Sequence, residues 1–189
     1  MKRLLAAVSM LCLVLGFQNC SQSSLQGSVE QASSQVAISV PSQNGESSSQ
    51  TVTYIEVPNI SGDSSVVQKA SEITPYRLVV SVNSGSIQLM DESNNVIEKR
   101  CLDSAQLKEL QTILAGSSVC AVQASNAEVC AMKYTPGYAS LYANEKRINL
   151  GEQRDSCGNG KKDLCGGLAN VFQNYVSFLR SNWSEMNCQ

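Results

Sequence analysis

The clearest structural pattern in the chain lies in residues 76–116, which read YRLVVSVNSGSIQLMDESNNVIEKRCLDSAQLKELQTILAG. Residues 77–82 and 87–90 are rich in β-branched and apolar side chains, as strands are. The polar residues between them include Gly85, which can take the positive φ of a tight turn. The pattern predicts a β-hairpin, with residues 96–102 as a third short strand or a continuation of the second.

A helix is expected next, over about 103–115. Asp103 and Gln106 have the spacing of a capping box. The apolar residues that follow recur at helical spacing, and they are Leu107, Leu110, Ile113 and Leu114. Gly116 stands where a helix commonly ends.

The second half of the chain repeats this order. Residues 138–143 and 147–150 predict a second hairpin, and the apolar spacing over 164–183 predicts a second amphipathic helix. Residues 117–131 and 151–162 are expected to be loops. The expected fold class is therefore α+β, with an antiparallel sheet from two hairpins and two amphipathic helices packed on one face.

The N-terminus predicts export. Lys2 and Arg3 precede the apolar run Leu4–Phe17, which is shorter than the roughly 20 residues of a membrane-spanning helix. Residues 1–19 are accordingly expected to be a signal peptide that is removed.

Cys20 follows this run after Gln18 and Asn19. A cysteine in this place resembles the lipobox of bacterial lipoprotein precursors, although Phe17, Gln18 and Asn19 stand where the box usually has Leu, a small residue, and Gly or Ala. The resemblance implies lipidation of Cys20 and anchoring in a membrane. Ser21, in place of Asp, implies the outer membrane of the cell envelope.

Residues 20–50 are expected to be the lipidated cysteine and a flexible tether, because Ser and Gln make up most of the stretch. Residues 51–73 contain a strand-like start, Thr51–Val57, followed by turn residues. They are an uncertain strand or linker. The compact domain is expected over residues 74–189.

The cysteines of the domain predict a disulfide framework, since an even number in an exported chain is typical of one. They are Cys101, Cys120, Cys130, Cys157, Cys165 and Cys188. No pair has the C-x2-4-C spacing of a structural zinc site, so no metal and no cofactor are expected. Sequence leaves the connectivity open. The predicted pairs are Cys120–Cys130, Cys157–Cys165 and Cys101–Cys188.

The composition of the chain excludes several classes of function. The chain has 14 Lys+Arg, 16 Asp+Glu and no histidine. A net charge of −2 with no basic cluster gives no reason to expect nucleic acid. Without imidazole, catalytic triads and histidine-ligated metals are excluded, and no complete catalytic motif is found. No catalytic residue is therefore assigned.

The expected function is a small non-catalytic binding domain for a protein or an envelope polymer, anchored to the membrane by its lipid. Tyr138 and Tyr142 are the candidate partner face, because they share strand parity and tyrosine is common in interfaces. One alternative is an envelope hydrolase that works without histidine. Another is a protease-inhibitor-like module, because the element order resembles small periplasmic inhibitors of metalloproteases.

Overall fold

The computed structural model describes residues 35–41, 47–60, 76–121 and 129–188. Within these ranges it contains eleven β-strands, two α-helices and one 3-10 helix. The strands are β1 (Val36–Pro41), β2 (Ser47–Ile60), β3 (Tyr76–Ser81), β4 (Ser86–Met90), β5 (Val96–Cys101), β6 (Val119–Ala121), β7 (Met132–Thr135), β8 (Ala139–Ala143), β9 (Lys146–Leu150), β10 (Gln153–Asp155) and β11 (Lys162–Leu164). The helices are α2 (Ser104–Leu114), α3 (Leu168–Asn182) and the 3-10 helix η2 (Trp183–Glu185).

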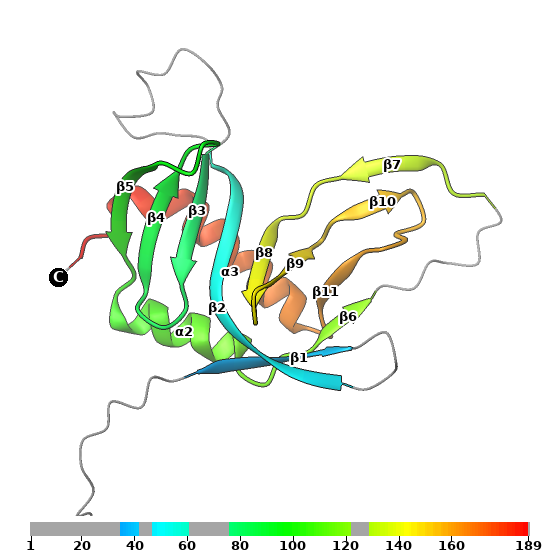
Figure 1. The fold of residues 1–189 in the computed structure, drawn as a ribbon, viewed down its shortest axis with the longest axis horizontal. Helices are drawn as coiled ribbons and strands as arrows, with labels where there is room; N and C mark the ends of the chain where they lie inside the picture. Colours follow the sequence, from blue (N-terminus) through cyan, green and yellow to red (C-terminus); the bar gives the residue numbers. More distant parts are fainter. Residues whose placement is uncertain (1–34, 42–46, 61–75, 122–128, 189) are drawn as a thin grey trace, which may run out of the picture. The chain divides into compact units, whose positions relative to one another are not determined.

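Seven of the strands form one antiparallel sheet with β2 at its centre (Figure 1). The order is β5-β4-β3-β2-β8-β9, and β1 pairs with the first part of β2. Val52 of β2 lies opposite Val36, whereas Tyr54 lies opposite Ser81 of β3 and Tyr142 of β8. The length of β2 thus lets one strand hold β1 and both halves of the sheet together.

Both helices bury apolar side chains against this sheet. Figure 1 shows α3 crossing one face, with α2 at the end of the sheet where β3 turns into β4. Leu110 and Leu114 of α2 and Phe172 and Leu179 of α3 are fully buried. The hydroxyl of Tyr175 donates to the Gln106 carbonyl across the two helices at 3.0 Å.

The expected α+β class with a sheet of two hairpins is wrong. Strands dominate the described residues, and the seven-stranded antiparallel main sheet joins the hairpin strands β3, β4, β8 and β9 with β1, β2 and β5. The two helices and the strands β3, β4, β8 and β9 do lie where sequence places them, and the Asp103–Gln106 capping box is present. Four of the strands that were missed, β6, β7, β10 and β11, have only three or four residues each, so their pairing depends on distant parts of the chain.

The domain also begins earlier than expected. β1 and the first residues of β2 fall within the predicted tether of residues 20–50. Val36 and Ile38 are buried in the core, on alternate positions of β1. Ser and Gln around these positions lower the mean hydropathy and hide this alternation. The uncertain stretch after residue 50 is strand up to Ile60.

Three disulfides are present, as expected from the cysteine count. Cys101–Cys188 is confirmed, but the two local pairs are wrong: the bonds are Cys120–Cys165 and Cys130–Cys157. Antiparallel pairing explains the difference. β6 runs beside β11, and β7 runs beside β10, so each cysteine meets one on the opposite strand or just beyond it.

β7 and β10 continue the path of β8 and β9 beyond the main sheet (Figure 1). The Tyr138 amide donates to the Leu150 carbonyl at 3.0 Å, and Gln153 then lies opposite Thr135. Cys130–Cys157 closes the far end of this ribbon. We call residues 129–135 and 152–162 the arm.

Cys20 and the predicted signal peptide lie outside the described residues. Among the residues that are described, no helix has both the length and the apolar character needed to cross a membrane.

Candidate functional site

The arm carries the most exposed apolar side chains in the described part of the chain. Val129, Met132 and Tyr134 are 87%, 88% and 68% exposed. Large apolar side chains gathered on one surface commonly mark a contact with another molecule. Methionine and tyrosine suit such contacts, because one adapts its shape and the other presents a rigid ring.

Two of these side chains border a shallow depression of about 450 Å³. It is lined by Met132, Lys133, Tyr134, Glu152 and Arg154. The Arg154 guanidinium is largely exposed and lies 3.8 Å from the Glu152 carboxylate. The depression therefore combines an apolar wall with a basic group that solvent can reach.

Charge distinguishes the arm from the rest of the protein. Its four basic residues are Lys133, Arg154, Lys161 and Lys162, and its two acidic residues are Glu152 and Asp155. The arm is therefore net positive, whereas the whole chain has a net charge of −2.

Asp155 holds the turn at the end of the arm. Its carboxylate accepts the backbone amides of Cys157 at 3.0 Å and Asn159 at 2.9 Å, and the Asn159 side-chain amide at 2.5 Å. The backbone amide of Asn159 is the main cause that lowers the pKa of Asp155 below its ordinary value. The hydrogen bonds of the Asp155 carboxylate are thus all made within the turn, and its charge stabilises that turn.

Asp155 also lies beside the arm disulfide. The sulfurs of Cys130 and Cys157 and a carboxylate oxygen of Asp155 lie within 4.8 Å of one another. Metal binding by cysteine requires thiolate, and these two sulfurs are bonded to each other. The cluster is a cross-linked turn, and we assign no metal to it.

The two candidate tyrosines do not form one face. Tyr138 packs against the core, with its ring 6.2 Å from that of Phe172, and its hydroxyl donates to Asp163 at 2.6 Å. Burial, and then the bond to the Asp163 carboxylate, raise the pKa of Tyr138. This tyrosine is a partly buried residue that packs against the core at the base of the arm.

Tyr142 belongs to a polar network on the main sheet. Its hydroxyl donates to Glu56 at 2.9 Å, and Arg147 donates to the other oxygen of Glu56 at 2.8 Å. Arg77 lies 3.7 Å from the same carboxylate. Burial, and then the bond to Glu56, raise the pKa of Tyr142. The network satisfies a carboxylate that is only 8% exposed, so we interpret it as structural.

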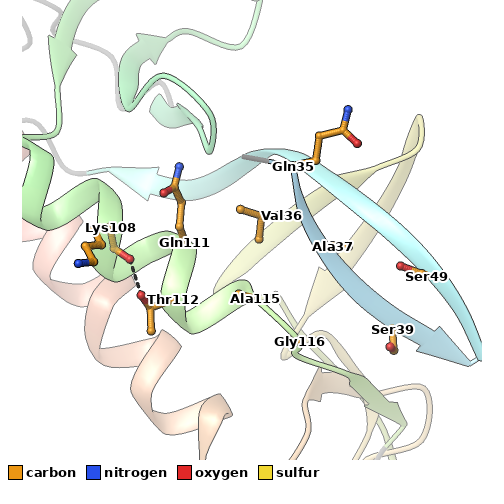
Figure 2. Close-up of a pocket in the computed structure, with 10 residues that line it drawn as sticks. All are labelled: Gln35, Val36, Ala37, Ser39, Ser49, Lys108, Gln111, Thr112, Ala115 and Gly116. Carbon is orange, nitrogen blue, oxygen red and sulfur yellow. Dashed lines mark hydrogen bonds between the residues drawn. The ribbon is translucent and has the colours of Figure 1, made fainter. Parts of the chain in front are cut away.

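A groove between β1 and α2 encloses about 520 Å³, somewhat more than the depression on the arm (Figure 2). Ten residues line it, and none is acidic: Gln35, Val36, Ala37, Ser39, Ser49, Lys108, Gln111, Thr112, Ala115 and Gly116. Gln111 donates to the Val82 carbonyl at 3.0 Å, and Thr112 donates to the Lys108 carbonyl at 2.7 Å. Its walls lack the paired carboxylates that a histidine-free hydrolase would need.

Sequence reasoning missed Met132 and did not predict β7 as a strand. Tyr134 gave a weak signal, since Tyr134, Tyr138 and Tyr142 recur every four residues. That spacing has no structural meaning, because β7 ends before Pro136 and the three side chains have different surroundings.

Comparisons with protein-family models, curated proteins and solved structures find no match for this chain.

Proposed function

We propose that this protein is a non-catalytic binding module, anchored at the bacterial outer membrane through a lipid on Cys20, that contacts a partner through the arm. The observation that carries the proposal is the pair Met132 and Tyr134, both exposed on one short strand. Burying such side chains in a complex removes apolar surface from water, which favours association.

The stiffness of the arm supports this role. A two-stranded ribbon alone is only marginally stable in water. Here Cys130–Cys157 ties its far end, and Tyr138 anchors its base in the core through Phe172 and Asp163. A surface fixed before binding loses less conformational entropy when it binds.

The composition of the site favours binding over catalysis. Of the two acidic residues of the arm, Asp155 is engaged in its own turn, and Glu152 accepts the Asn149 side-chain amide at 2.5 Å. No carboxylate pair remains beside the depression for acid–base chemistry. The arm therefore offers no candidate site for the hydrolase alternative.

The anchor is tested by intact-mass analysis of the protein from membranes of its host. We expect a mature chain that begins at Cys20 and carries acyl chains. The matched Cys20→Ala variant should lack them and leave the membrane fraction. A wild-type chain without lipid would refute the anchoring.

The binding surface is tested by photo-cross-linking in intact cells. A benzophenone amino acid at position 134 should give one discrete adduct, and Met132→Ser should reduce its yield several-fold. Position 99 on β5 is also exposed and provides the control. Equal adducts from positions 134 and 99 would rule out the arm as the contact surface.

A further inference from the structure

No other strand of the described residues covers the outer edge of β7. Among the described residues β7 pairs with β10 alone, in a two-stranded sheet. The Ser156 amide donates to the Ala131 carbonyl at 2.9 Å, and the Ala131 amide donates to the Ser156 hydroxyl at 3.0 Å. Both backbone groups of Ala131 thus face β10. Because these directions alternate along an antiparallel strand, the amide and carbonyl of Met132 face outward.

Side chains beside this edge suit an extended ligand. The register between β7 and β10 shifts between Met132 and Thr135, but Met132 and Tyr134 both border the same depression, so their side chains are available on one side of the strand. Together with Arg154 they line the depression. A strand laid along β7 would place every second side chain over these groups, which is how edge-binding domains recognise peptides.

The basic residues of the arm indicate which kind of strand would bind to β7. Lys133 lies on β7 itself and is exposed, and the exposed Arg154 is on the neighbouring strand. The arm is net positive. An acidic residue in the ligand would pair with these cations, whereas a second copy of the arm would bring like charges together.

The open edge also argues against insertion into a membrane. Backbone groups without partners are costly in hydrocarbon, because no water is there to bind them. The Met132 amide and carbonyl would be such groups, but an added strand would satisfy both.

Building on the function proposed above, we propose that the partner supplies an extended acidic and apolar segment that adds as a strand to the β7 edge. The partner is thus a protein, recognised by backbone hydrogen bonds at Met132 and by side-chain contacts with Tyr134, Lys133 and Arg154.

The test uses residues 20–189 with Cys20→Ser and intact disulfides. A phage-displayed library of random 12-residue peptides is selected against it. We expect peptides that alternate apolar and acidic residues. Met132→Ala keeps the outward amide and should weaken their binding several-fold through loss of the side chain, whereas Met132→Pro also removes the amide and should weaken binding at least about tenfold more than Met132→Ala.

Hydrogen exchange on the unmodified sequence provides a second measurement, which does not depend on whether Met132→Pro folds. A selected peptide should protect the Met132 amide. The proposal would be overturned if the selection gave no such peptides, or if a bound peptide left this amide unprotected. Binding of the protein to vesicles of phosphatidylcholine and phosphatidylglycerol in place of peptides would overturn it as well.

Failure of strand addition can be told apart from failure of the proposed function. A cross-link at position 134 that persists in Met132→Pro would retain the arm as a binding surface and reject strand addition. If position 134 gives no cross-link in the protein without the Met132 substitution, both the arm as a binding surface and strand addition are rejected.

Discussion

Tyr138 is the residue at which β8, β11 and α3 meet. Its ring contacts Phe172, its hydroxyl donates to Asp163, and its carbonyl accepts from Arg180 at 2.9 Å. Asp163 is only 6% exposed, and its remaining partners are its neighbour's amide and a long contact to Gln173. Position 138 therefore supports a buried carboxylate in addition to filling space.

We expect Tyr138→Phe to destabilise the fold by about 1–3 kcal/mol, because the Asp163 carboxylate loses a buried donor. Tyr142→Phe is the matched control. Its partner Glu56 keeps the bond from Arg147, so the loss should be about 0.5–1 kcal/mol. Urea unfolding at neutral pH measures both. Equal losses would show that the Tyr138 hydroxyl has no special role.

Acid should loosen the end of the arm. The pKa of Asp155 is lowered from its ordinary value of 3.8, so the charged carboxylate is the form that the folded turn favours. Its contribution to stability is present above pH 3.8 and is lost as the pH falls through the lowered pKa. The amide signals of Cys157 and Asn159 should shift with this titration in NMR spectra. A titration midpoint of these signals at or above pH 3.8 would contradict the role of the Asp155 carboxylate in the turn.

At the scale of elements, the disulfides act on different parts of the molecule. Cys101–Cys188 spans 87 residues and Cys130–Cys157 spans 27. By chain entropy these closures stabilise by about 4.5 and about 3.5 kcal/mol. The first ties the C-terminal end to β5, and the second closes only the arm.

Replacing Cys101 and Cys188 by serine should therefore lower the melting temperature of the whole domain. Replacing Cys130 and Cys157 should mainly speed amide exchange in β7 and β10 and change the core little, because the arm can open locally. Calorimetry measures the melting temperature of each double variant, and residue-resolved hydrogen exchange shows which part of the protein opens. The assignment is wrong if the arm variant unfolds the core first.

Elements with a complete local signal were predictable from sequence. The helix α2 has its capping box, and β8 and β9 have alternating residues around a short turn. β7 and β10 have no such signal: each is a few residues long, and β7 is exposed throughout. Their pairing is fixed by the neighbouring hairpin and by Cys130–Cys157, so the arm and the binding surface proposed on it could not be predicted from sequence alone.

At the scale of the whole molecule, the N-terminal limit of the domain is the main correction to the sequence-based picture. β1 is joined to β2 by pairs from Val36 to Pro41, and its buried residues lie in the common core. A stretch that composition assigns to the tether is thus part of the sheet.

A chain that starts at Gln35 should retain the stability of the longer one. A chain that starts at Ser47 loses the burial of Val36 and Ile38, which we expect to cost about 3–6 kcal/mol. Thermal unfolding of the two chains, both with oxidised cysteines, measures the difference. Equal melting temperatures would mean that β1 is dispensable.

The order of the disulfides along the chain has a consequence for biosynthesis. The three bonds are nested, with Cys130–Cys157 inside Cys120–Cys165 and both inside Cys101–Cys188. A polypeptide that crosses a membrane from its N-terminus presents Cys101, Cys120 and Cys130 before any native partner emerges. With the export proposed above, oxidation in order of arrival would join neighbours wrongly, and we expect correct pairing to require an isomerase that reshuffles early bonds.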